Sequence, residues 1–184
     1  MNEPYICDMQ MESKARDHAE TLPNLCWAVL ITIGSSKISL VELEHMLFIA
    51  NAANRLELPI SDGNTEDIED TLEYLIGLGA VKGNAFQVSL DDYGLLLYNH
   101  APEHAYGLYT PIIHVKTALS YATIYQLVVL SSFYYGFNGA ADLKHIETCI
   151  SRLKIWGTPI SEFKKDDFEY ALKLGLHMRI TEER

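Results

Sequence analysis

Two stretches of the chain contain no charged side chain, and their hydrophobic patterns predict two buried helices. They are residues 21–36 (TLPNLCWAVLITIGSS) and residues 117–141 (TALSYATIYQLVVLSSFYYGFNGAA). The second stretch is long enough to span a membrane, but polar residues interrupt it and no basic cluster flanks it. A helix that is apolar on nearly every side is typical of the core of a globular protein. We therefore expect two core helices and no membrane span.

The segments that follow these two stretches share an ordered set of features, which predicts an internal repeat. Each segment begins with a helix-start signal, which in the first half is a capping box formed by Ser39 and Glu42. Apolar residues then recur at helical spacing, and each segment reaches the sequence Pro-Ile-Ser, at residues 59–61 and at residues 159–161. A third amphipathic helix follows in both halves and ends at a glycine, after which a strand begins.

The first half continues with the pattern of a β-hairpin. Two short strands flank a turn at Gly83 and Asn84. Three helices followed by a hairpin form a winged helix-turn-helix. The sequence LDDYG at residues 90–94 resembles the ending L-T-x-x-G of winged-helix domains, with Asp in place of Thr. The expected fold class is therefore mostly α with small β wings, arranged as a tandem winged helix-turn-helix repeat.

This interpretation divides the chain into four segments. Residues 1–20 form a polar N-terminal extension, residues 21–99 the first winged-helix domain, residues 100–116 a connector and residues 117–184 the second winged-helix-like domain. The second half has no second wing strand of its own. Within the connector, residues 110–116 (TPIIHVK) are the candidate for the pairing strand, because residues 112–115 are β-prone.

The sequence carries no catalytic or cofactor signature. It has no Gly-rich phosphate loop and no nucleophile elbow. His145 and Cys149 stand four residues apart on one predicted helix face, but two ligands do not make a metal site. The three cysteines form no CxxC pair and the N-terminus has no secretory signal, which fits a reducing cytoplasm. We expect a cytoplasmic protein that is not an enzyme and binds neither a cofactor nor a metal.

The excess of acidic residues lies in the first half of the chain. The net charge is -11, and residues 1–100 carry 16 acidic and 5 basic side chains, which accounts for all of it. In the third helix of the first copy, Ile68, Leu72 and Leu75 are expected to face the core, which leaves five carboxylates outside. Because these would repel DNA phosphates, the first copy is not expected to read DNA. The five carboxylates are Glu66, Asp67, Glu69, Asp70 and Glu73.

Two features indicate surfaces for a protein partner. The acidic helix face would attract a basic surface. The second neutral stretch is rich in aromatic side chains, which are enriched at protein interfaces. The candidate partner-binding residues are Glu66, Glu69, Asp70 and Glu73 on the first surface and Tyr121, Tyr125, Phe133, Tyr134, Tyr135 and Phe137 on the second.

An acidic chain with two winged helices and no DNA-reading surface resembles the kleisin-interacting tandem winged-helix subunits of SMC-type ATPase complexes. The small middle proteins of bacterial defence systems built on SMC-like ATPases are similar in size. The resemblance is architectural, covers about residues 21–184 and transfers no residue roles. It implies a non-catalytic subunit that binds an SMC-like ATPase, a kleisin-like chain or a second copy of itself. It also implies that DNA is contacted only weakly or indirectly, in chromosome handling or antiviral defence.

Two other functions fit the sequence. The first is a transcription regulator or antitoxin that contacts DNA through the second copy, where basic side chains alternate with acidic ones. The second is a single all-helical domain with an unrelated interaction role, in which the repeat has no structural meaning. The candidate nucleic-acid-binding residues are Lys144, Arg152, Lys154, Lys164, Lys165 and Lys173.

Overall fold

The computed structural model describes residues 3–60, 65–84 and 86–137, together with Asp166, Glu169, Tyr170, Ala171 and Lys173. Within these ranges, side chains are described from Met9 to Ser131 and at the five later residues. The described part is mostly helical, with a small antiparallel sheet of three strands. In chain order the elements are α1 (Glu3–Thr21), α2 (Asn24–Ile33), β1 (Ile38–Ser39), α3 (Leu40–Asn54), α4 (Glu66–Gly77), β2 (Val81–Gly83), β3 (Gln87–Leu90), α5 (Asp92–Asn99), α6 (Glu103–Ala118) and α7 (Ile124–Phe137).

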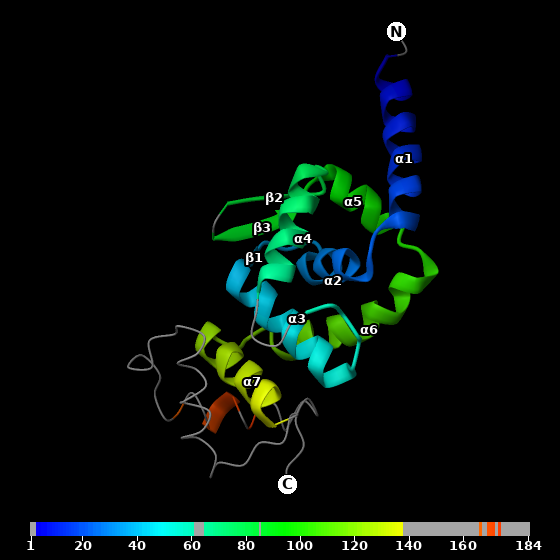
Figure 1. The fold of residues 1–184 in the computed structure, drawn as a ribbon. Coiled ribbons are helices and arrows are strands. Elements are labelled where there is room, and N and C mark those ends of the chain that lie inside the picture. The colour runs from blue at the N-terminus through cyan, green and yellow to red at the C-terminus, as the bar shows by residue number, and fades with distance from the viewer. Residues whose placement is uncertain are drawn as a thin grey trace.

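Helix α2 is the centre of the fold (Figure 1). Every residue from Leu25 to Ile33 is buried, because α3, α4 and α6 pack around the helix. A helix that is enclosed in this way needs apolar side chains on every face, which is the pattern of the first neutral stretch. The first predicted core helix is therefore confirmed. The helix ends at Gly34, whose φ of 57° is a conformation that glycine adopts without strain.

The sheet brings the start of α3 against the hairpin that follows α4. The strand order is β1–β3–β2, and Ile38 pairs with Val88 while Val81 pairs with Leu90. The predicted hairpin is confirmed, but its turn lies one residue later than expected, because Gly83 belongs to β2 and pairs with Val88. The side-chain oxygen of Asn84 shapes the turn by accepting hydrogen bonds from backbone N–H groups that follow it.

The predicted capping box begins α3. The Ser39 hydroxyl accepts a hydrogen bond from the Glu42 backbone N–H at 3.2 Å, and the Glu42 carboxylate accepts one from the Ser39 N–H at 2.9 Å. Two backbone donors that the helix itself cannot satisfy are thereby paired. This local signal fixes where α3 starts and therefore which of its side chains face α2.

Helix α4 presents the face that its sequence predicts. Ile68, Leu72 and Leu75 are buried, and the helix packs against α2. The chain leaves the helix at Gly79, whose φ is 76°, and the Ala80 N–H donates to the Leu75 carbonyl at 2.9 Å. These contacts orient α4 so that its acidic side faces solvent.

Helix α5 returns the chain to the core after the hairpin. The sequence offers Ser89 or Asp91 as the cap of this helix, and the structure shows Asp91, whose side chain accepts a hydrogen bond from the Asp92 N–H at 3.0 Å. Leu97 is fully buried and Leu96 is partly buried against the core. The sequence predicts a short helix that returns Leu95, Leu96 and Leu97 to the core, and this prediction is wrong for Leu95, which is exposed. Three successive positions of a helix point in different directions.

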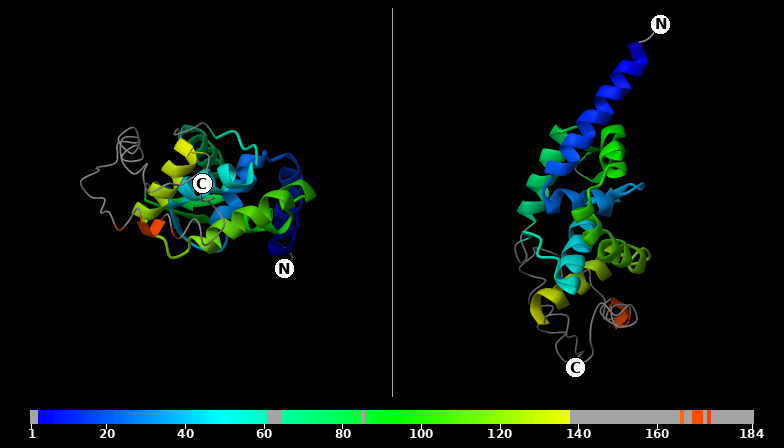
Figure 2. Two further views of the ribbon diagram at one scale, coloured as in Figure 1. Left: turned by 90° about the horizontal axis from the view of Figure 1, so that it is seen from below. Right: turned by 90° about the vertical axis from the view of Figure 1, so that its right-hand side faces the viewer.

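The polar N-terminal segment forms α1, which packs against α5. Ala15 and Ala19 are buried, and the Tyr93 hydroxyl lies 2.9 Å from Nδ1 of His18. Beyond this contact, α1 continues away from the rest of the molecule, at the end opposite α7 (Figures 1 and 2).

Residues 110–116 are helical, so their expected role as a pairing strand is wrong. They belong to α6, which packs against α2 and α3. Ala105, Leu108, Ile112 and Val115 are buried at helical spacing, and this burial overrides the β-propensity of the Ile-Ile pair. The Lys116 ammonium then reaches across to α2 and donates to the Ile33 carbonyl at 2.9 Å.

The second neutral stretch is divided between two helices. Its first residues end α6, and α7 begins at Ile124 behind a capping box, in which Thr123 N–H donates to the Gln126 side chain at 2.9 Å. Leu127 to Leu130 are buried and α7 packs against α3, so the prediction of a core helix is confirmed for this part. The Ser131 hydroxyl lies 2.9 Å from Nδ1 of His45 on α3.

Most of the expected second copy lies outside the described residues. This includes the Pro-Ile-Ser sequence at 159–161 and the pair His145 and Cys149. Asp166, Glu169, Tyr170, Ala171 and Lys173 are helical, and Ala171 is fully buried.

Candidate protein-interaction surfaces

The acidic face of α4 is the first candidate surface. The four predicted partner-binding carboxylates are exposed, on the side of the helix opposite its buried leucines. Tyr74 and Ile76 are exposed on the same helix, so apolar area adjoins the carboxylates. A surface of this composition can attract a basic partner and also bury apolar contact area. The carboxylates are Glu66, Glu69, Asp70 and Glu73.

Part of this acidity stabilises α4 itself. Glu66, Asp67 and Glu69 lie in the first turn, where the helix dipole favours negative charge. The Thr65 hydroxyl donates to the Glu69 carboxylate at 3.0 Å. Asp70 and Glu73 lie beyond the first turn, where this local stabilisation fades. The helix dipole therefore accounts for the acidic residues of the first turn but not for Asp70 and Glu73.

Glu44 on α3 extends the acidic surface, and sequence reasoning missed it. Burial raises the pKa of Glu44 to about 7, and the negative charge of Glu69 adds to the shift. A cation placed beside Glu44 would favour its charged form. No sequence pattern identifies this carboxylate, because its burial and its proximity to Glu69 arise only in the folded chain.

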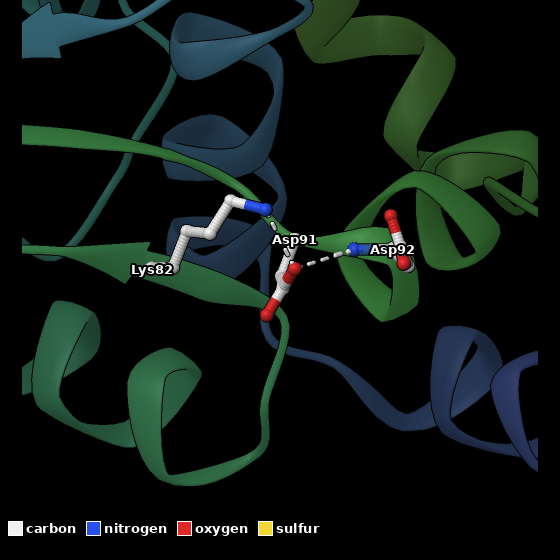
Figure 3. A network of polar contacts seen from close by, with 3 residues as sticks. All are labelled: Lys82, Asp91 and Asp92. Carbon is white, nitrogen blue, oxygen red and sulfur yellow. Dashed lines mark hydrogen bonds and ion pairs between the residues drawn. The ribbon is translucent and has the colours of Figure 1, made fainter.

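The hairpin offers little positive charge. Lys82 is the single basic residue between Val81 and Leu90, and its ammonium lies 2.8 Å from the Asp91 carboxylate (Figure 3). The hydrogen bond to Asp91 raises the pKa of Lys82, and the same bond lowers the pKa of Asp91. Because Lys82 is already paired with a carboxylate, it is a poor ligand for a DNA phosphate.

The aromatic surface is only partly described. Tyr121 precedes α7 and is 93% exposed, and Tyr125 in the first turn of α7 is 39% exposed. The structure therefore brings these two predicted residues to one end of α7, near solvent. The other four belong to α7, but their side chains lie outside the described part: Phe133, Tyr134, Tyr135 and Phe137.

A groove lies where β1, the hairpin turn and the start of α7 meet. Its volume is about 390 Å³, and the walls combine apolar side chains with the polar residues Ser39, Asn84 and Gln87. Phe86 and Ile124 line it and are 79% and 44% exposed. Sequence reasoning missed this groove because its walls come from three segments that are far apart in the chain.

Of the six candidate nucleic-acid-binding residues, one lies in the part of the chain that the structure describes. Lys173 is exposed and helical, and Asp166 on the same short stretch is exposed too. The other predicted basic residues lie outside the described part, namely Lys144, Arg152, Lys154, Lys164 and Lys165.

Two features of the described residues bear on metal and thiol chemistry. No group of three or more His, Cys, Asp and Glu side chains is positioned to hold a metal ion within this part of the chain. Cys26 is buried, and burial raises the pKa of its thiol to about 11, so it is not a reactive nucleophile. Among the described helices, none is both long and apolar enough to cross a membrane.

Comparison of the chain with protein-family models, with curated proteins and with solved structures finds no match in any of the three.

Proposed function

We propose that the protein is a non-catalytic interaction subunit that holds a protein partner through the acidic face of α4. The element order α2–β1–α3–α4–β2–β3, with strand order β1–β3–β2, supports a winged helix-turn-helix in the first half. In DNA-reading proteins of this class the recognition helix, which corresponds to α4, enters the major groove. The observation that carries the proposal is that this helix exposes carboxylates where a DNA reader needs amides and bases.

The proposed partner is basic at its contact surface. By the architectural resemblance, it is a subunit of a multiprotein complex with an SMC-like or other DNA-handling ATPase, such as a kleisin-like chain. In this proposal residues 117–184 complete a tandem winged-helix repeat, and the complex works in the cytoplasm. The ATPase performs the chemistry, and the present chain positions it.

Purification of the tagged chain from its native cells, followed by mass spectrometry, tests this proposal. Reversing the α4 face with E66K, E69K, D70K and E73K should abolish recovery of the partner. A matched control reverses four exposed carboxylates on other segments and should retain the partner; its changes are D17K, E20K, E57K and E103K.

Both sets alter the net charge equally. Each reversal adds two charges, so four move the total from -11 to -3. A difference between the two variants therefore reports the position of the charges. Equal losses in both variants, or the absence of any co-purifying protein, would contradict the proposal.

The regulator or antitoxin remains the alternative function. The exposed Lys173 favours it, although Asp166 nearby opposes it. A gel-shift assay with duplex DNA at low salt separates the two. Tight binding that persists at physiological salt without another protein would favour the regulator, whereas binding that disappears with salt would favour the interaction subunit.

A further inference from the structure

The groove between β1, the hairpin turn and α7 presents apolar side chains to solvent. Val41, Phe86 and Ile124 come from α3, from the hairpin turn and from α7, and all three are exposed. Exposed apolar side chains are ordinary when they are scattered, but three that line one concavity mark a binding site for another apolar group.

Several polar groups of the groove, which Ser39, Asn84 and Gln87 supply, are engaged within the chain. The Ser39 hydroxyl and backbone N–H both bond to the Glu42 carboxylate, and the Asn84 oxygen accepts from the backbone of the turn. The Phe86 carbonyl accepts a hydrogen bond from the Leu40 N–H. These partners leave the groove with few free polar groups, which favours an apolar side chain over a polar small molecule as its occupant.

A carboxyl group lies one helical turn away from the groove. Val41 and Glu44 are three residues apart on α3, so their side chains are neighbours on one face, about 5–6 Å apart at Cβ. Glu44 in turn feels the charge of Glu69 on α4. The surface therefore passes from an apolar groove to two carboxylates within a short distance.

We propose that this groove binds an apolar anchor residue of the partner, and that a Lys or Arg close to that anchor in the partner's sequence contacts Glu44 and Glu69. This inference rests on the proposed function, because it specifies how the partner of α4 is recognised. Charge complementarity identifies the occupant: the groove gives room for the apolar group, and the adjacent carboxylates require a cation. A second copy of this chain fits less well, because its net charge of -11 opposes approach to an acidic surface.

Selection from a displayed random peptide library on the full-length protein tests the proposal. Enriched peptides should combine a large apolar residue with Lys or Arg no more than about four residues away. Their binding should weaken about tenfold or more in V41S/F86S and in E44K. The matched controls are L95S/Y106S, which removes apolar groups exposed on α5 and α6, and E20K; both should bind as the unaltered chain does.

Circular dichroism first establishes that each variant is folded, which is expected because Val41 and Phe86 are exposed. Peptides without this composition, or binding that V41S/F86S leaves unchanged, would overturn the proposal. Dimerisation in light scattering that V41S/F86S abolishes would overturn it too, because the occupant would then be a second copy.

The cellular experiment separates this proposal from the broader one. If the native partner co-purifies with V41S/F86S as well as with the unaltered chain, the groove has no role, but the interaction function stands. If no partner co-purifies with any form of the chain, the interaction function fails, whatever peptides the groove selects.

Discussion

Replacing Glu44 by Gln should stabilise the protein at alkaline pH much more than at acidic pH. Burial and the charge of Glu69 hold the pKa of Glu44 at about 7 in the folded chain, against an ordinary value of 4.5. Between these two values the folded state binds more protons than the unfolded state, so Glu44 lowers the stability as the pH rises through this range. Glutamine has nearly the same shape and no charge, and the variant therefore lacks this loss.

The size of the effect follows from the shift. A difference of about 2.5 pKa units at about 1.4 kcal/mol each gives an upper bound of roughly 3–4 kcal/mol. Glu44 is only partly buried, and solvent screening reduces the expected gain to about 1–2 kcal/mol. Most of this gain should be present at pH 8 and about a quarter of it at pH 5, since the unfolded carboxyl is already partly ionised there.

Urea denaturation of both proteins at pH 5 and pH 8 measures this gain. The control E20Q removes an exposed carboxylate of α1 and should change stability little at either pH. E69Q should recover a smaller part of the gain, because the charge of Glu69 is the second cause of the shift. A stability difference between E44Q and the unaltered protein that is the same at both pH values would refute the reasoning.

Three further predictions concern the folded core. L72A should destabilise the protein by about 2–5 kcal/mol in denaturant titration, because Leu72 is buried on α4. A loss below about half a kcal/mol would mean that the helix face is misassigned. G94A should cost about 1–3 kcal/mol in the same assay, because an added Cβ would overlap the Ala80 carbonyl; G107A, where an added Cβ meets no atom, is its control. With Cys7 and Cys149 replaced by Ser, the Cys26 thiol should resist a thiol reagent at pH 8 until urea unfolds the chain, and rapid native labelling would contradict its burial.

Local patterns predicted the parts of the fold that depend on neighbouring residues. The capping box of Ser39 and Glu42, the buried face of α4 and the hairpin all follow from spacings of a few residues. The box of Thr123 and Gln126 was equally readable in the sequence, and it would have placed the start of α7 correctly. Apolar residues lie on both sides of Thr123, so the hydrophobic pattern alone does not show a helix boundary there.

Features that depend on distant segments could not be predicted in this way. Residues 110–116 have β-prone side chains, but packing of α6 against α2 makes them helical. The raised pKa of Glu44 comes first from burial and then from the charge of Glu69 on α4, and the groove at Phe86 requires α7 to reach the hairpin. The acidic face of α4 was predictable because its residues all belong to one helix, whereas the groove was not.

Zero-length cross-linking of the purified complex tests most directly whether the acidic face of α4 holds the partner. A carbodiimide joins carboxylates to amines that are in contact, so lysines of the partner should be linked to α4. The account predicts cross-linked peptides in which partner lysines join Glu69, Asp70 or Glu73, with few links to Asp17 and Glu20 of α1, although these are exposed too. Links confined to α1 or to other carboxylates outside α4 would contradict it.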